Sequence, residues 1–392
     1  MKKSKSIALV LTLMLIIGAL AGCGNGAGVE EGDDVIIIGL NYELTGDYAQ
    51  YGKGCALGIE MAVNEINEAG GIDGKMIKIE KVDNKSDNNE AMNVATRLAT
   101  QDNVVTMLGP ATSGAFKATH SVADQYKIPV ISCSSTANDV TVDAKGKVRD
   151  WVFRTCYNDN FQGSVMGSFA YNDLSAVKAI ILSDKGNDYS QGLSESFEKT
   201  FTDLGGTIVS KEYFTAADND FSPVLTNIKA KEYDVIFLPA YYESVGPIIK
   251  QARAAGIDAP ILGADGYDSE KMLELAGSKE ALNNVFFTNH YSSGDTAEDV
   301  VTFVQNFKAA HNGAEPSGFN ALGYDLAYFA ADAIKRAGST DTDAIRQALA
   351  KTVDFKGVTG TFSIDENHDP VKSTVIIEFV DGVQTFKTKA GL

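Results

Sequence analysis

The sequence lacks the motifs on which most catalytic and cofactor sites depend. Its four histidines, His120, His290, His311 and His368, have no metal-ligand spacing, so no zinc site is expected. No dinucleotide fingerprint, phosphate loop, nucleophile elbow or EF-hand loop is complete. We therefore expect no catalytic residue, no metal and no cofactor, and a protein that is not an enzyme.

Cysteine is also scarce, with four residues in the chain. Besides Cys23 there are Cys55, Cys133 and Cys156, which is an odd number and too few for a disulfide scaffold. Cys55 falls on the apolar side of a predicted helix, so we interpret it as a small buried hydrophobic residue. Cys133 and Cys156 each lie near the end of a predicted strand, and a disulfide between them is left open.

Basic residues are outnumbered: the sequence has 34 lysines and arginines and 52 acidic residues, which gives a net charge of −18. Such an acidic chain is a poor partner for nucleic acid or for anionic lipid. We therefore expect neither as a ligand.

Only one long apolar run is present, at residues 7–20, and it follows three lysines at the N-terminus. It is shorter than the ~20 residues that a membrane helix needs, so residues 1–22 are predicted to be a signal peptide. Leu20-Ala21-Gly22-Cys23 resembles the lipobox of bacterial lipoproteins, which are acylated on the cysteine. This predicts a lipid anchor on Cys23 and a flexible tether at 23–33; the alternative is an ordinary secretory signal with a chance cysteine.

Short β-branched runs alternate with amphipathic segments, a pattern typical of parallel sheets covered by helices on both faces. Strands are predicted at 35–40, 77–82, 104–108, 128–132, 179–182, 208–213, 235–238, 261–263 and 285–288, and helices at 52–69, 90–101, 161–172, 191–204, 245–255, 297–311, 321–337 and 342–351. The strand–helix order occurs once before about residue 157 and again at 158–287. The pattern predicts an α/β fold with two similar doubly wound lobes.

The C-terminal part is too short for a third domain, so we expect it to complete the first lobe and then to end in a hairpin. The hairpin strands are predicted at 375–380 and 383–387, because Asp381-Gly382 between alternating apolar runs is a strong two-residue turn signal.

Hydroxyl side chains follow two predicted strands of the first half. Ser113 lies in a Gly/Pro-containing segment that opens a helix, and Ser134 and Thr136 follow the next strand. Open α/β sheets bind ligands at the carboxyl ends of their strands, and hydroxyls with free N–H groups at a helix start suit a carboxylate. For Ser113 taken alone, an ordinary helix N-cap is as good an interpretation as a carboxylate-binding residue.

The second half has acids framed by tyrosines at its strand ends. Asp184 is followed by Tyr189, Tyr241 comes after the next strand, and Asp265 precedes a glycine and another tyrosine. A carboxylate with aromatic faces suits a small cation. Together the two halves offer what a zwitterion bound between them requires.

Several longer stretches resemble the periplasmic leucine/isoleucine/valine-binding proteins and their relatives among type I solute receptors. The resemblance extends over about residues 35–386 and is carried by the segments 45–52, 66–72, 153–155 with 162–163, 189–192 and 251–256. It implies a branched-chain amino-acid substrate-binding lipoprotein of an ABC transporter, with two lobes that close on the ligand as a venus flytrap.

The resemblance also implies roles for individual residues. Ser113 and Thr136 would hold the α-carboxylate of the ligand, while the Ser134 carbonyl and Asp265 would hold its ammonium group. The walls of the pocket would be formed by Tyr51, Tyr189 and Tyr241. Two departures stand out: the family's usual cysteine pair near the pocket has no counterpart at matching positions, and Asp265 stands where branched-chain receptors often have glutamate.

We therefore expect one lobe at 34–157 plus 288–360, a second at 158–287 plus 361–390, and a hinge between them. The resemblance implies an extracytoplasmic monomer, anchored to the outer face of the membrane, that delivers its ligand to a permease and ATPase. The alternatives are a receptor for another small zwitterion, amide or carboxylate, and a ligand-sensing module.

Overall fold

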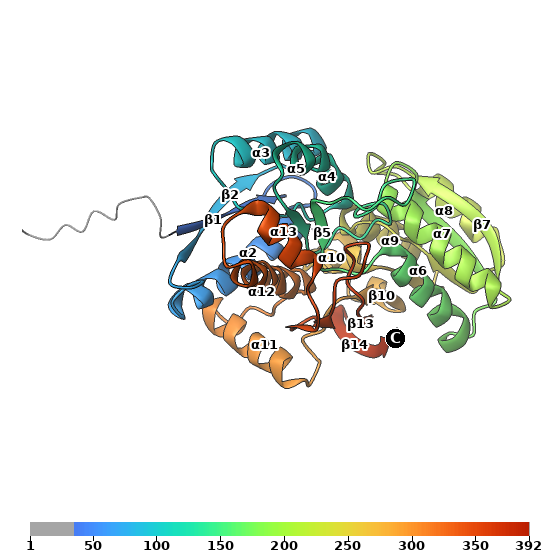
Figure 1. Ribbon diagram of the computed structural model, residues 1–392. Coiled ribbons are helices and arrows are strands. Elements are labelled where there is room, and N and C mark those ends of the chain that lie inside the picture. Colours follow the sequence, from blue (N-terminus) through green and yellow to red (C-terminus); the bar gives the residue numbers. More distant parts are fainter. Residues whose placement is uncertain (1–34, 392) are drawn as a thin grey trace, which may run out of the picture. The chain divides into compact units, whose positions relative to one another are not determined.

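The computed structural model describes residues 35–391. The predicted signal peptide 1–22, the lipidation residue Cys23 and the tether 23–33 lie outside the described residues. Two principal sheets organise the described chain, each accompanied by helices (Figure 1). The α/β class and the parallel sheets predicted from the sequence are confirmed.

The first sheet is built from the N-terminal strands. These are β1 Val35–Tyr42, β2 Met76–Asp83, β3 Thr106–Leu108, β4 Val130–Ser132 and β5 Val152–Arg154, in the order β2-β1-β3-β4-β5. The β1–β3, β3–β4 and β4–β5 pairs are parallel. Because their carboxyl ends meet at one edge, the polar segments that follow β3 and β4 are brought together there.

The second sheet begins after residue 177 and includes the C-terminus. Its strands are β6 Lys178–Asp184, β7 Thr207–Phe214, β8 Val235–Phe237, β9 Ile261–Gly263, β10 Val285–Asn289, β13 Thr374–Val380 and β14 Val383–Ala390, in the order β14-β13-β10-β9-β8-β6-β7. The pairs from β7 through β10 are parallel, and β13 and β14 add an antiparallel edge. The predicted hairpin is confirmed, with Asp381 and Gly382 at φ of 49° and 80°, the sign that a type I′ turn requires.

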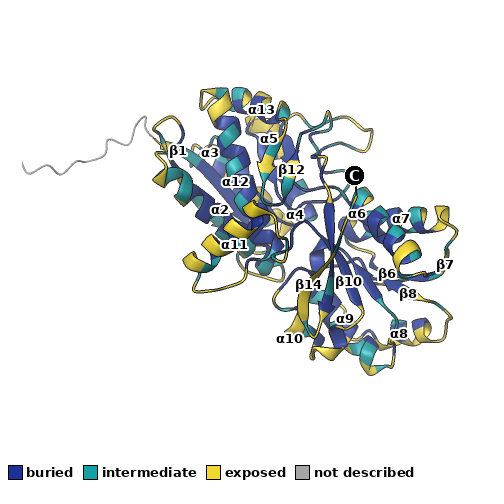
Figure 2. Cartoon of the chain, turned by 90° about the horizontal axis from the view of Figure 1, so that it is seen from below, coloured by how far each residue is buried: buried dark blue, intermediate teal, exposed yellow. Residues whose placement is uncertain are grey.

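Helices connect the strands and cover the sheets. They are α2 Ala49–Glu68, α3 Asn88–Thr100, α4 Ser113–Ala118, α5 His120–Tyr126, α6 Asp159–Ser168 continued by a π turn Phe169–Asp173, α7 Asp188–Asp203, α8 Ser222–Lys229, α9 Tyr242–Ala254, α10 Met272–Ala276, α11 Glu298–Ala310, α12 Gly318–Ala337 and α13 Thr342–Ala350. A short ribbon of β11 Phe355–Gly357 and β12 Gly360–Phe362 precedes β13. The inner strands of both sheets are buried, whereas the edge strands β2, β7 and β14 are mostly half-buried or exposed. Helices such as α8 and α11 have an exposed side (Figure 2).

Most predicted helices begin a few residues earlier in the structure than the apolar periodicity indicates. In several of them a polar residue caps the start: Asn187 accepts a hydrogen bond from the Tyr189 amide at the start of α7, and Ser317 forms a capping box with Asn320 at the start of α12. Helices α2 and α9 also start early but have no side-chain cap hydrogen bond. Polar cap residues do not contribute to the apolar periodicity, so a helix predicted from that periodicity starts after its cap.

Helix α12 returns to pack against α2, although the two are far apart in the sequence (Figure 1). Two glycines allow the close approach. A Cβ at Gly58 would lie 2.0 Å from the Asn320 carbonyl oxygen, and one at Gly323 would lie 2.1 Å from the Cys55 carbonyl oxygen. Helix α12 is therefore tied to α2, which follows the first strand of the first sheet, while β13 and β14 belong to the second sheet.

The chain passes between the two sheets after β5, after β10 and before β13. The passing segments are hydrogen-bonded to one another: Thr374 Oγ lies 2.9 Å from the Asn289 carbonyl oxygen and 3.0 Å from Tyr157 Oη. Beside them the buried Arg154 guanidinium donates to both Asp369 oxygens at 2.7 Å. These contacts hold the three connecting segments side by side.

Cys133 and Cys156, between which the sequence allows a disulfide, are both free thiols in the structure. Cys55 is fully buried, as predicted for a small hydrophobic residue. Its sulfur lies 3.4 Å from that of Cys133.

Candidate functional site

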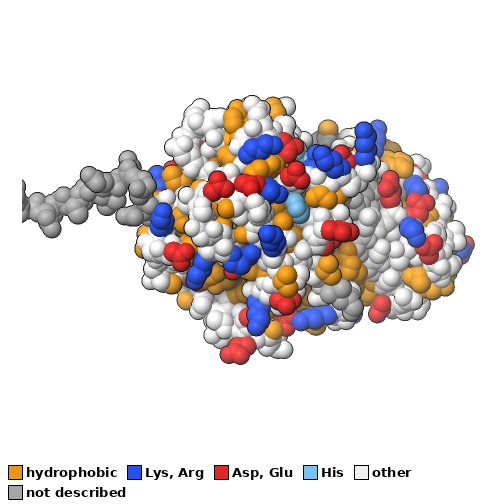
Figure 3. Space-filling model, in the orientation of Figure 1, with side chains coloured by type: hydrophobic (Ala, Val, Ile, Leu, Met, Phe, Trp, Pro, Cys, Tyr) orange, Lys and Arg blue, Asp and Glu red, His pale blue; other side chains and the backbone are white. Residues whose placement is uncertain are grey.

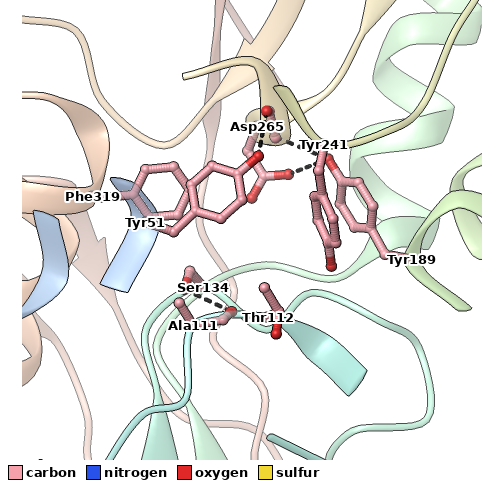
Figure 4. A pocket seen from close by; sticks show the side chains of 9 residues that line it. Tyr51, Ala111, Thr112, Ser134, Tyr189, Tyr241, Asp265 and Phe319 are labelled. Atoms are coloured by element: carbon pink, nitrogen blue, oxygen red, sulfur yellow. Dashed lines mark hydrogen bonds between the residues drawn. The ribbon is translucent and has the colours of Figure 1, made fainter. Parts of the chain in front are cut away.

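A small cavity lies at the strand ends, where the two sheets meet. Its empty volume is about 230 Å³, and its lining residues are Tyr51, Ala111, Thr112, Ser134, Tyr189, Tyr241, Asp265, Gly266 and Phe319 (Figure 4). Predicted ligand residues among them are Tyr51, Ser134, Tyr189, Tyr241 and Asp265.

Asp265 provides the acid of the cavity. It follows strand β9 in a single 3₁₀ turn, Asp265–Tyr267, and it is 4% exposed. The Tyr189 hydroxyl donates to one carboxylate oxygen at 2.8 Å, and His290 Nε2 lies 3.2 Å from the other. In Figure 4 the carboxylate points between Tyr51 and the pair of Tyr189 and Tyr241.

His290 supports Asp265 without neutralising it. Burial lowers the pKa of the imidazole, and the attraction of Asp265 offsets only part of that effect. The ring is stacked on Tyr157 with centroids 3.8 Å apart. A neutral imidazole that donates from Nε2 orients the carboxylate and brings no positive charge to the cavity.

Aromatic rings form two walls of the cavity. Tyr189 and Tyr241 are stacked with centroids 4.8 Å apart, and Tyr51 packs on Phe319 at 4.5 Å. Burial raises the pKa of Tyr189 and Tyr241 well above the ordinary value, so their hydroxyls remain protonated at neutral pH. The walls therefore combine apolar ring faces with hydroxyl donors.

Several hydrogen bonds join the first-sheet side of the cavity to the second-sheet side. The Tyr51 hydroxyl on α2 donates to the Gly266 carbonyl at 2.6 Å and accepts from the Tyr242 amide at 3.2 Å. The Tyr242 hydroxyl donates to the Asp47 carbonyl at 2.6 Å. The two sides thus contact each other directly beside the cavity.

A buried carboxylate organises the first-sheet rim. Glu43, at the end of β1, accepts from the Ala111 and Thr112 amides at 3.0 Å and from the Thr112 hydroxyl at 2.8 Å. Burial raises its pKa, although these hydrogen bonds oppose the effect. The sequence suggested that amides in this segment are free for an anion; those of Ala111 and Thr112 are already used by Glu43.

The three hydroxyls predicted from the first half take different positions. The Ser134 hydroxyl lines the cavity and donates to the Ala111 carbonyl at 3.0 Å. Ser113 is the first residue of α4 and accepts from the Ala137 amide at 3.2 Å. The buried Thr136 hydroxyl makes no well-formed hydrogen bond, yet it is close enough to Asp159 to lower the pKa of that carboxyl. Ser113 and Thr136 are thus buried beside the cavity but are not among its lining residues.

A polar layer behind Asp265 was missed by the sequence reasoning. Gln162 Nε2 donates to Asp159 at 2.9 Å, and Gln162 Oε1 accepts from the Thr288 hydroxyl at 3.0 Å and from the Asp265 amide at 3.5 Å. Burial raises the pKa of Asp159 to about 8, with hydrogen bonds opposing the effect. Asp159 precedes the predicted helix at 161–172, and in the structure it is an acid in the first turn of α6, an ordinary place for one; only its tertiary burial distinguishes it.

Phe319 and His290 were also missed as site residues. Phe319 continues the apolar stripe of a predicted helix, and such a residue ordinarily packs in a core. His290 is a lone histidine after a strand. No local signal separates either residue from its structural use.

Within residues 35–391, no group of three or more His, Cys, Asp or Glu side chains is arranged to hold a metal ion. No helix among the described residues is long and apolar enough to cross a membrane. On the face seen in Figure 3, acidic and basic side chains are interspersed.

Comparison with known proteins places these features in context. Residues 35–384 match a family described as periplasmic binding protein. The Leu/Ile/Val-binding protein homolog 1 of Brucella suis is 30% identical over 336 residues, which cover 86% of this chain and 87% of that protein.

Two solved structures share the whole architecture. The branched-chain amino acid transporter substrate binding protein of Streptococcus pneumoniae, in complex with isoleucine, is 38% identical with a TM-score of 0.84, covering 91% of this chain and 98% of that one. A leucine binding protein of Thermotoga maritima is 33% identical with a TM-score of 0.84, covering 90% and 98% respectively.

Proposed function

This chain belongs to the periplasmic binding protein family, and on that premise we propose that it is the solute receptor of an ABC importer for a branched-chain amino acid. Its fold is that of type I periplasmic binding proteins. The observation that carries the proposal is the Asp265 carboxylate, held by Tyr189 and His290 at a cavity whose other walls are aromatic rings and hydroxyls. The Streptococcus pneumoniae relative that binds isoleucine supports the choice of ligand.

In this proposal each side of the cavity recognises one part of the ligand. Asp265 and the Ser134 carbonyl bind the α-ammonium group, while Ser113 and Thr136 bind the α-carboxylate. The rings of Tyr51, Tyr189, Tyr241 and Phe319 surround the aliphatic side chain, which gains free energy by leaving water. The acidic side for the cation and the hydroxyl side for the anion together select a zwitterion.

We propose that the ligand is captured by closure of two lobes, 34–157 plus 288–360 and 158–287 plus 361–390. The three connections that are hydrogen-bonded near Thr374 would form the hinge. A ligand that touches both sides at once would stabilise the closed arrangement, in which contacts across the cavity such as that of Tyr51 with Gly266 are formed. The closed form would then be recognised by a permease, with an ATPase driving import.

The screen that tests the proposed ligand is a thermal-shift measurement with the twenty amino acids and a panel of small amides and carboxylates. A ligand at 100 times its dissociation constant stabilises the folded protein by about 2.7 kcal/mol, which raises the melting temperature measurably. We expect leucine, isoleucine or valine to give the largest rise. A largest rise with a carboxylate that has no amino group would contradict the zwitterion assignment.

We also propose that the protein is an extracytoplasmic monomer, anchored through acyl chains on Cys23 and without enzymatic activity. The lipobox-like segment at 20–23 supports the anchor. Changing Cys23 to Ser should leave unprocessed precursor or release soluble protein, because the acyl acceptor is removed. A Cys23→Ser protein that is still correctly processed and membrane-bound would refute the anchor.

A further inference from the structure

Two buried thiols meet directly beneath the cavity wall. Cys55 lies on α2 and Cys133 follows β4, and the two sulfur atoms are 3.4 Å apart. Both side chains are fully buried. They are 78 positions apart in the sequence, so only the tertiary fold brings them together.

The surroundings of the pair make its two thiols unequal. Burial raises the pKa of Cys55. Burial also opposes ionisation of Cys133, but hydrogen-bond contacts with Cys55, Tyr42 and Ser134 outweigh it and lower the pKa of that thiol. The Tyr42 hydroxyl is 3.7 Å from the Cys133 sulfur. In the folded protein Cys133 is therefore the more acidic of the two thiols.

From this juxtaposition we propose that Cys55 and Cys133 become a disulfide in the exported protein. A disulfide has an S–S length of ~2.05 Å, so side-chain rotation has to bring the two sulfurs about 1.3 Å closer. The proposal rests on the extracytoplasmic location proposed above, because disulfides persist in oxidising compartments.

The reaction requires an external disulfide as oxidant, either a thiol-oxidising protein or a small disulfide. The Cys133 thiolate attacks one sulfur of that disulfide, forms a mixed disulfide and releases the other sulfur as a thiolate. The Cys55 thiolate then attacks the Cys133 sulfur and releases the second sulfur of the oxidant. Two protein thiols lose two electrons and two protons, and the oxidant becomes two thiols. Because both cysteines are buried, the exchange takes place before the fold is complete.

The bond would join two walls of the ligand cavity. Cys55 is one helical turn after Tyr51 on α2, and Cys133 directly precedes Ser134. Closing a long loop by a covalent bond reduces the conformational entropy of the unfolded chain, so the oxidised protein should be more stable. It should also hold Tyr51 and Ser134 at a fixed separation.

Peptide mapping of the exported full-length protein tests the proposal. The protein is alkylated in denaturant without reductant and digested with trypsin, which places the three cysteines on separate peptides, 54–75, 128–145 and 155–178. We expect a disulfide-linked pair of 54–75 with 128–145, and alkylated Cys156. Recovery of all three cysteines alkylated, or a link that includes Cys156, would overturn the proposal.

Thermal unfolding with and without reductant provides a second readout. The wild type and the matched control Cys156→Ala should lose several degrees of melting temperature on reduction, whereas Cys55→Ala and Cys133→Ala should not respond. Equal responses of all four proteins would contradict the pairing. Failure of the thiols to pair would leave ligand binding in the amino-acid screen unchanged, so the two proposals can fail separately.

Discussion

At the scale of single residues, the proposed recognition depends most on Asp265. Asn in its place keeps the shape and removes the charge that would pair with the ligand's ammonium group. Losing a charge pair in a closed cleft costs about 2–5 kcal/mol, so the Asp265→Asn protein should bind isoleucine tens to thousands of times more weakly in calorimetry.

The control for Asp265→Asn is Asp381→Asn, because Asp381 also precedes a glycine but lies in the exposed hairpin turn. If Asp265 is merely a turn residue, both variants will bind as the wild type does. Wild-type affinity in Asp265→Asn would remove this residue from the site.

A second residue-scale prediction concerns Asp159, whose carboxyl pKa is raised by burial from 3.8 to about 8. Between these values the unfolded chain releases the proton while the folded protein keeps it. The folded state therefore binds more protons, and this group makes stability fall as the pH rises from about 4 to 8.

Replacing Asp159 with Asn removes that pH dependence while an oxygen remains to accept from Gln162. At pH 8 the free energy of unfolding of the ligand-free variant should exceed that of the wild type by on the order of a few kcal/mol, so the variant should unfold at a higher temperature. The difference should disappear near pH 4. Asp173→Asn, an exposed change at the other end of the same helical segment, should show no such trend. A variant less stable than the wild type at pH 8 would show that Asp159 is ionised in the folded protein.

At the scale of elements, the packing of α2 on α12 positions Tyr51, Cys55 and Phe319. Ala in place of Gly58 improves helix propensity by about 1 kcal/mol, but its Cβ would meet the Asn320 carbonyl oxygen at 2.0 Å. Overpacking of this kind costs about 1–3 kcal/mol or more, so Gly58→Ala should lower the free energy of unfolding in denaturant titration.

Gly294→Ala is the matched control, because the nearest neighbour of its new Cβ would be 3.6 Å away. If Gly58→Ala is as stable as the wild type, α2 and α12 can move apart at no cost in free energy. This contact would then not fix the cavity walls.

Much of the architecture was predictable because strands and helices have different apolar periods. The strand pattern also predicted where the cavity lies, since Ser134, Tyr189, Tyr241 and Asp265, which line it, all follow strands whose carboxyl ends converge. Short elements such as α4 and β11 have too few residues to show a period.

The remaining site residues were not predictable for a different reason. Phe319, Gln162, Asp159 and His290 have their roles because distant segments bury them, and burial of that kind leaves no local signal. The same holds for the contact of Cys55 with Cys133, which joins a helix to a strand end.

At the scale of the whole molecule, the proposal requires the two lobes to move. Tyr51 contacts Gly266 beside the cavity, and Lys117 pairs with Asp188 elsewhere between the proposed lobes. A ligand that touches both sides should strengthen that arrangement. Small-angle scattering should therefore give a smaller radius of gyration with saturating isoleucine than without it. An unchanged radius at saturation would contradict capture by hinge closure.

The central claim is that this cavity binds one branched-chain amino acid. Isothermal titration calorimetry of the purified ligand-free protein with isoleucine tests it most directly, with leucine and valine titrated in parallel. We predict saturable binding of one molecule per chain for at least one of the three. Absence of saturable binding by all three, in protein shown to be folded and free of carried-over ligand, would contradict the account.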